Sequence, residues 1–264
     1  MKRNQNLIHQ SAGVLAMVGI FLLGTAHLSS AQDSETPAAE ETPKVEEKPK
    51  PKWQRSMAAG ITLTKGNSDT LLFTANAVGI RKWDKNELEL GADGARGENN
   101  GTVNTETLSG YFQYNRLVSE KAYFMLRTEA LHDTIADVEL RLTVSPGVGY
   151  YLIKEEKRNL GIEVGPTFVY DKLGSGDNSY MALRVGERFE TAISERARLW
   201  QTMEWLPQVN DMANFIVNFE LGVEADLTEK LSLRVTLQDV YDNEPAPGRQ
   251  ENDIRLVSGI AYKF

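Results

Sequence analysis

Charged residues of both signs recur at every second position in several stretches of this sequence. In an extended strand, residues two or four apart point to the same side. Nine such residues form the candidate site: Arg127, Glu129, Glu139, Arg141, Arg184, Arg188, Glu220, Arg234 and Arg255. If they line an enclosed space, they make either a polar, ion-selective conduit or a lumen plugged by paired charges, since buried ions must be paired. The chemistry that they predict is therefore electrostatic.

Residues that could catalyse a reaction are scarce. His9 and His27 fall in an N-terminal segment that we expect to be removed, which leaves His132 beside Asp133. Neighbours on a strand point to opposite faces and no serine motif accompanies them, so a hydrolase is a weak alternative. One remaining histidine and no cysteine exclude two-histidine and thiolate metal sites. No catalytic residue, cofactor or metal ligand is predicted.

The elements that must position the charged residues are strands. From Trp53 to the end, apolar and polar side chains alternate in runs that are separated by turn residues. The expected strands are 53–63, 69–82, 86–96, 104–116, 121–132, 138–152, 159–170, 178–190, 197–207, 213–225, 230–241 and 252–264. About twelve antiparallel strands, an even number, are typical of a bacterial single-chain transmembrane β-barrel.

The alternation also predicts which side chains face lipid and which face the lumen. In 138–152, Val138, Leu140, Leu142 and Val144 oppose Glu139, Arg141 and Thr143. In 230–241, Leu231, Leu233, Val235 and Leu237 oppose Ser232, Arg234, Thr236 and Gln238. Apolar outside and polar inside is the pattern of a membrane barrel.

The connections between strands indicate the same architecture. Short connections around 83–86, 117–121, 153–157, 193–196 and 227–230 alternate with longer ones, for example 97–103, 171–178 and 242–251. Outer-membrane barrels have short periplasmic turns and longer outer loops, whereas a soluble β-sandwich, the alternative, has no reason to alternate them. Pro146 and Pro166 each adjoin a glycine inside a predicted strand, so we expect β-bulges there.

Aromatic residues gather near the ends of the predicted strands. They are Trp53, Trp83, Tyr150, Tyr151, Tyr170, Trp205, Tyr241, Tyr262 and Phe264. Girdles at the two membrane interfaces explain this placement. Tyr262 and the terminal Phe264 resemble the C-terminal signal by which bacterial outer-membrane barrels are assembled, so the barrel assembly machinery is an expected partner. An amphipathic edge strand of a soluble protein is the alternative.

The N-terminal part reads as two segments that precede the barrel. Residues 1–31 combine a basic start, an apolar core and a small-residue cleavage site, which predicts a secretory signal peptide rather than an uncleaved anchor. Residues 32–52 are rich in Glu, Lys and Pro, and we expect a disordered periplasmic linker. Without residues 1–31 the chain carries 27 basic and 37 acidic residues. This acidic balance argues against a nucleic-acid partner.

A family resemblance rests on short motifs. Gly66-Asn67-Ser68-Asp69-Thr70, the run Ser145-Pro146-Gly147-Val148-Gly149-Tyr150, Gly165-Pro166 and the phenylalanine ending resemble the salt-induced outer-membrane protein family, a bacterial group of unknown function. The resemblance covers residues 53–264 and implies location and fold, with no activity or catalytic residues to carry over.

The combined expectation is an all-β, antiparallel transmembrane β-barrel of about twelve strands at residues 53–264, in the outer membrane and in contact with its lipid. The expected function is non-enzymatic: a small passive, porin-like channel for ions or small solutes, or an envelope-integrity protein linked to salt or osmotic stress. A surface ligand-binding barrel with a closed lumen is the alternative.

Overall fold

A computed structural model describes residues 52–64, 70–245 and 248–264. Its regular elements are twelve strands: β1 (Trp53–Thr64), β2 (Thr70–Trp83), β3 (Asn86–Asn99), β4 (Thr102–Leu117), β5 (Ala122–Asp133), β6 (Val138–Lys154), β7 (Arg158–Leu173), β8 (Gly176–Ser194), β9 (Ala197–Pro207), β10 (Phe215–Asp226), β11 (Leu231–Asp242) and β12 (Asn252–Lys263). Each predicted strand is present. The predicted signal peptide, all but residue 52 of the predicted linker, and motif residues 66–69 lie outside the described residues.

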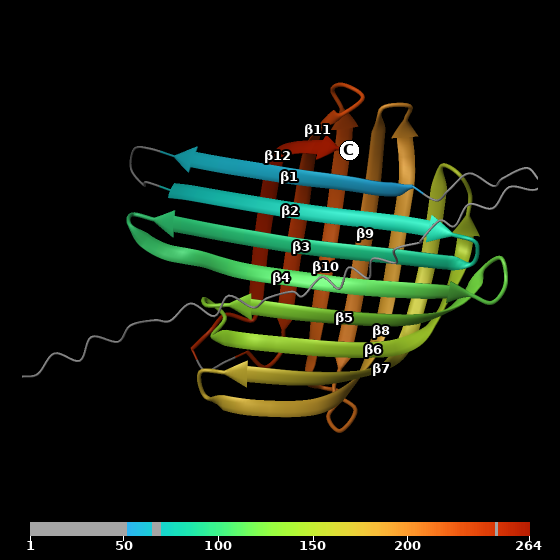
Figure 1. The fold of residues 1–264 in the computed structure, drawn as a ribbon. Helices are drawn as coiled ribbons and strands as arrows, with labels where there is room; N and C mark the ends of the chain where they lie inside the picture. The colour runs from blue at the N-terminus through green and yellow to red at the C-terminus, as the bar shows by residue number, and fades with distance from the viewer. Residues whose placement is uncertain (1–51, 65–69, 246–247) are drawn as a thin grey trace, which may run out of the picture. The chain divides into compact units, whose positions relative to one another are not determined.

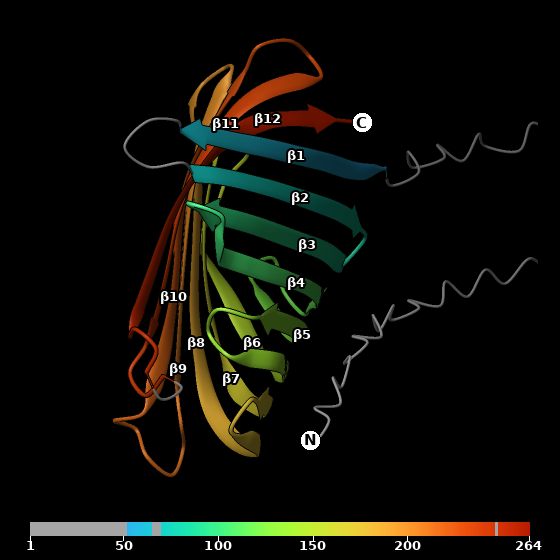
Figure 2. The ribbon, with the colours of Figure 1, turned by 90° about the vertical axis from the view of Figure 1, so that its left-hand side faces the viewer.

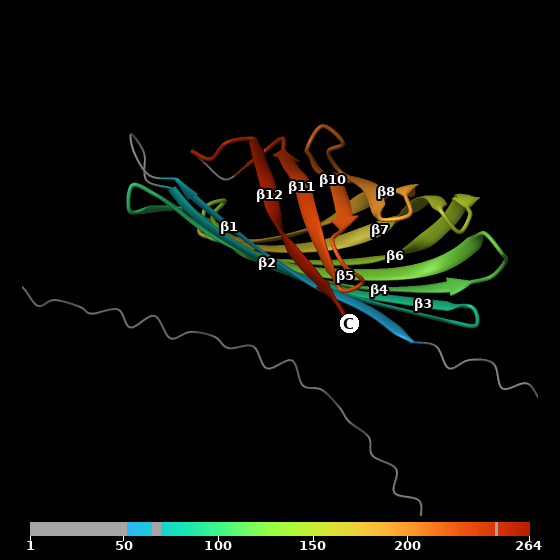
Figure 3. The ribbon, with the colours of Figure 1, turned by 90° about the horizontal axis from the view of Figure 1, so that it is seen from above.

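The twelve strands close into an antiparallel barrel in which each strand pairs with the next and β1 pairs with β12. Figure 1 shows β1 to β7 running across the front and β9 to β12 behind them at a steep angle, with β8 bending from the first group toward the second. Figures 2 and 3 show the same wall from two other sides. Such crossing is expected because the strands of a closed barrel tilt about its axis. No helix able to cross a membrane is found among the described residues.

The closing seam between β1 and β12 is the least paired part of the wall. Only four residue pairs join the two strands, from Ser56↔Lys263 to Ala59↔Ile260. Next to this stretch, a Cβ on Gly60 would lie 2.4 Å from the carbonyl oxygen of Ser258. Glycine is therefore required at the point where the two backbones cross.

The alternation of side chains between the two faces follows the sequence closely in β11. Leu233 and Val235 are exposed on the outer face, at 44% and 38%, whereas Ser232 and Thr236 are buried on the inner face. The outer face presents apolar side chains to lipid and the inner face collects the polar ones, as the alternation predicts.

The inside–outside assignment is wrong at the start of β6. The register with β7 shifts between Val138 and Leu140, which marks a bulge. Val138 is consequently buried instead of facing outward with Leu142. A bulge adds one residue to one strand, so the period of two slips at that point.

The expected bulges at Pro146 and Pro166 are absent. The register between β6 and β7 is the same before residue 145 and after residue 147, so the two prolines lie opposite each other. Neither proline has a backbone N–H, and residues 145–147 of β6 have no paired residues on β7. Gly165 lets the backbones approach, since a Cβ there would lie 2.1 Å from the carbonyl oxygen of Pro146.

Two of the three long connections that the sequence predicts are tight turns. Asn100 and Gly101 join β3 to β4 with φ angles of 50° and 77°, and a turn ending at Gly176 joins β7 to β8. Turns with positive φ suit the twist of paired strands, so the strands run on to the turn. Among the described connections at this end, only those after β9 and β11 exceed four residues.

Candidate functional site

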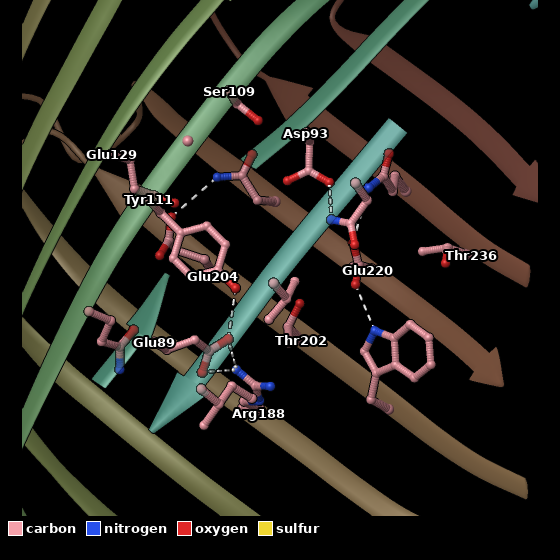
Figure 4. Close-up of a pocket in the computed structure, with 18 of the residues that line it drawn as sticks. Glu89, Asp93, Ser109, Tyr111, Glu129, Arg188, Thr202, Glu204, Glu220 and Thr236 are labelled. Atoms are coloured by element: carbon pink, nitrogen blue, oxygen red, sulfur yellow. Dashed lines mark hydrogen bonds and ion pairs between the residues drawn. The ribbon is translucent and has the colours of Figure 1, made fainter. Parts of the chain in front are cut away.

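The inward faces of all twelve strands enclose a cavity of about 1190 Å³. Lys154 and Lys263 line it at the end where β1 begins, and Arg141 and Ile216 line it in the opposite half. Its wall includes eleven basic and ten acidic residues. Figure 4 shows carboxylates from several strands pointing into the same space, together with Arg188. The lumen is therefore highly charged but close to neutral.

The structure places eight of the nine candidate site residues on the wall of this cavity. These are Arg127, Glu129, Arg141, Arg184, Arg188, Glu220, Arg234 and Arg255. Glu139 does not line it: its carboxylate pairs with Lys172 and its side chain is 53% exposed. The cause is the bulge at the start of β6, which takes Glu139 out of phase with Arg141.

Arg184 of β8 holds together the most buried charge cluster. Its guanidinium donates to Glu163 of β7 at 2.8 Å and also to Glu204 of β9. Glu163 accepts two further hydrogen bonds, from Gln113 at 2.8 Å and from Tyr123 at 2.9 Å. One arginine thus pairs with two carboxylates, and the cluster connects β4, β5, β7, β8 and β9.

Arg127 extends this cluster along β5. It donates to Glu129 on the same strand and to Gln113 on β4, the latter at 2.9 Å. Its guanidinium carbon also lies 4.6 Å from the ring centroid of Tyr111, within the range of a cation–π contact.

A cross-lumen ion pair joins strands that are not neighbours in the barrel. Arg188 of β8 donates to both carboxylate oxygens of Glu89 on β3, at 2.9 and 3.0 Å. Tyr111 of β4 donates to the same carboxylate at 2.7 Å. Figure 4 shows these three side chains meeting inside the cavity. The pair obstructs part of the lumen.

A second cluster reinforces the wall beside the weak seam. Glu224 of β10 pairs with Arg234 at 2.7 Å, with Lys263 at 3.0 Å and with Arg198 at 3.3 Å. Arg234 of β11 also donates to Asn76 of β2 at 3.0 Å. This contact reaches across β12 and β1. Side chains inside the barrel therefore connect the strands on either side of the seam, where only four backbone residue pairs join β1 and β12.

Seven charged residues on the cavity wall have no ion-pair partner within the described part of the chain, and Asp93, Glu220 and Arg255 are three of them. Asp93 accepts a hydrogen bond from Asn76 at 2.6 Å, and Glu220 accepts from Trp200 at 2.6 Å and from Gln238 at 3.0 Å. Arg255 donates to Thr107 at 3.4 Å. These residues keep a net charge that a solute in the lumen can meet.

Aromatic residues of the lumen were missed or misassigned from the sequence. Tyr151, expected in an interfacial girdle, donates to Glu87 across the cavity. Tyr111, Tyr123 and Trp200 also line the cavity. Trp200 is two residues from Arg198 and four from Glu204, so all three side chains point to the same side of the strand. This alternation was the feature of the sequence that could have placed Trp200 in the lumen.

The adjacent His132 and Asp133 do not contact each other. The His132 ring nitrogens lie 2.8 Å from the backbone oxygen of Glu139 and 3.2 Å from the Thr134 hydroxyl. Asp133 accepts from Thr107 at 3.1 Å and from two backbone amides. No cluster of three or more metal-ligating side chains is found in the ranges that the structure describes.

These features define the class of protein. A closed antiparallel barrel with an apolar outer face and a polar lumen is an outer-membrane β-barrel, because only closed barrels and helices satisfy every backbone group in lipid. The chain belongs to the DUF481 family, a family of proteins of unknown function, which matches residues 57–264. This confirms the resemblance to a family without an established activity. None of the curated proteins compared by sequence matches the chain.

Solved structures share the fold at low sequence identity. The NanC porin is similar with a TM-score of 0.50 and 9% identity, over 80% of this chain and 100% of that one. The translocator domain of autotransporter NalP from Neisseria meningitidis has a TM-score of 0.45 and 12% identity, over 80% and 87% of the two chains. The KdgM porin has a TM-score of 0.45 and 5% identity, over 80% and 99%.

Proposed function

We propose that this protein is a non-enzymatic, passive channel of the outer membrane for ions and small polar solutes. The observation that carries the proposal is the cavity of about 1190 Å³, lined by charged and polar side chains along the barrel. A polar interior suits hydrated solutes, and rings of charged side chains can select among ions. The neighbour with a TM-score of 0.50 is itself described as a porin.

The passage is narrow. Twelve strands enclose less space than the 16 to 18 strands of porins with open aqueous channels. The Glu89–Arg188 pair takes up part of that space. We therefore expect passage of small ions and solutes and exclusion of larger ones.

The setting of this channel follows from the sequence. We propose that residues 1–31 direct export, that residues 32–52 are a periplasmic linker, and that Tyr262 and Phe264 are read by the barrel assembly machinery. Both termini are then periplasmic. A link to salt or osmotic stress rests on the family resemblance alone.

The second candidate is a barrel with a closed lumen that binds a ligand through its outer loops. The observation in its favour is the same cross-lumen pair, since Arg188 and Glu89 come from non-neighbouring strands and meet inside the lumen. The two candidates differ in whether the purified barrel conducts ions.

Recordings in planar bilayers test the proposal, and Arg188→Ala is the most informative variant. We expect small discrete conductance steps for the wild type, and steps roughly two-fold larger for Arg188→Ala because the variant widens the constriction. Arg158→Ala is the control, since Arg158 pairs with Glu155 outside the cavity and both side chains are more than half exposed. A barrel that is silent in all three forms would support the closed alternative.

Measurements of ion selectivity test whether permeating ions pass the unpaired carboxylates Asp93 and Glu220. A unit charge about 8 Å from a permeating ion contributes about 2 kcal/mol at an effective dielectric constant of 20. We expect Asp93→Asn and Glu220→Gln each to lower the cation-to-anion permeability ratio several-fold, as measured by reversal potentials in a salt gradient. Glu156→Gln, in an exposed turn, is the control. An unchanged ratio in both lumen variants would show that permeating ions do not pass these carboxylates.

A further inference from the structure

Two arginines, Arg55 of β1 and Arg81 of β2, lie among aromatic rings at the end of the barrel where β1 begins. By strand alternation they point to the same side as the exposed Met57, Ile61 and Phe73, and Arg55 also borders the cavity. The guanidinium carbon of Arg55 is 5.9 Å from the ring centroids of Trp53 and of Phe264. That of Arg81 is 5.9 Å from Trp53 and 5.5 Å from Trp83. We call these five residues the arginine–tryptophan cluster. The rings hold both guanidinium groups at one site by cation–π contacts.

Within residues 52–64, 70–245 and 248–264, this cluster keeps a positive charge. No carboxylate in the part of the chain that the structure describes pairs with Arg55 or Arg81, whereas outward-facing Arg96 pairs with Glu106 at 2.6 Å. The Nε of Arg81 is shielded from solvent and has no hydrogen-bond partner. A shielded donor without a partner costs free energy, so the cluster is suited to bind an anion.

The position of the cluster identifies the kind of anion. Further along the outer face, Met57, Ile61 and Phe73 expose more than half of their side chains, as expected for contact with acyl chains. The cluster lies at the end of this apolar surface, and the ring of Tyr114 lies beside it, with its centroid 6.5 Å from that of Trp83. Aromatic residues at this depth mark the level of the lipid head groups.

We infer that Arg55 and Arg81 bind the phosphate of an anionic phospholipid. A guanidinium group donates two parallel hydrogen bonds to phosphate oxygens, which an ammonium cannot do. The cluster contains two guanidinium groups, no acidic side chain and one carboxylate, the terminal carboxylate of Phe264, so it keeps a net positive charge. Phosphatidylglycerol is therefore preferred over phosphatidylethanolamine. The site is independent of whether the lumen conducts.

Native mass spectrometry of the full barrel in detergent tests this site, with phosphatidylglycerol or phosphatidylethanolamine added. We expect tighter binding of phosphatidylglycerol to the wild type. The double variant Arg55→Gln/Arg81→Gln should weaken it about ten-fold or more, the effect of losing several charge-assisted hydrogen bonds. Arg158→Gln, an exposed and ion-paired arginine near the same end, should bind like the wild type.

Three results would overturn the inference: equal binding of both lipids, unchanged binding in the double variant, or displacement of the lipid by millimolar inorganic phosphate, which would identify a free-phosphate site. Heat-modifiable gel mobility verifies that each variant is folded. If the glutamine variant fails to fold, Arg55→Lys/Arg81→Lys keeps both charges but loses the paired donors. It should then bind phosphatidylglycerol more weakly than the wild type, and equal binding would contradict the assignment.

Discussion

Arg184→Ala is expected to lower the free energy of unfolding by about 3–5 kcal/mol, the cost of removing one partner from a buried ion pair. The Arg184 side chain is 7% exposed and pairs with two carboxylates, Glu163 and Glu204, which are 14% and 12% exposed. Both carboxylates would remain in the lumen wall without a neutralising cation. The loss should appear as a lower urea midpoint in detergent micelles, read by tryptophan fluorescence.

Two further variants distinguish charge from packing at this position. Arg158→Ala breaks an exposed pair whose side chains are 52% and 59% exposed, so its effect should stay within about 1 kcal/mol. The triple variant Arg184→Met/Glu163→Gln/Glu204→Gln should recover most of the lost stability, because replacing a whole buried ion network is often near neutral. If Arg184→Ala shifts the midpoint no more than Arg158→Ala, water in the lumen screens the cluster.

Val235→Arg is expected to impair insertion of the barrel, because an arginine on the lipid face costs about 2–4 kcal/mol near the membrane midplane. Val235 lies near the middle of β11, is 38% exposed on the outer face, and is flanked by Val223 on β10 and Ser258 on β12. The expected result is a smaller fraction of compact, heat-modifiable protein in the outer-membrane fraction than for the wild type.

Gln238→Arg, on the opposite face of the same strand, is the matched control. Gln238 lines the cavity and donates to Glu220 at 3.0 Å, so an arginine there gains a carboxylate partner. This variant should assemble like the wild type. Equal impairment of Val235→Arg and Gln238→Arg would contradict the assignment of inner and outer faces in β11.

The lumen charges also have a structural role in this barrel. Closure depends on four backbone pairs between β1 and β12, far fewer than along the other strand junctions. The contact between Arg234 and Asn76 reaches across these two strands, and Lys263 of β12 pairs with Glu224 of β10. Part of the charged lining therefore stabilises the closed wall, and the rest remains available to solutes.

The sequence alone determined the strands and, in most of them, the two faces. Alternation of apolar and polar residues is a local property, so the opposition of Leu233 and Val235 to Arg234 and Thr236 could be predicted without knowing any strand partner. The same local pattern placed eight of the nine candidate charges on the cavity wall. It failed at Glu139, where a bulge shifts the register, and at Tyr151, whose residue type suggested a membrane interface.

Only the tertiary structure decided which charges pair and which remain free. Glu89 and Arg188 are 99 residues apart, and Asn76 and Arg234 are 158 apart, so their contacts depend on closure of the barrel and on the register of every strand between them. Closure also brings Phe264 against Arg55, near the opposite end of the described chain. Periodicity records the face on which a side chain lies, but it holds no information about the distance across the lumen or around the wall, because that distance is set by the pairing of strands remote in sequence.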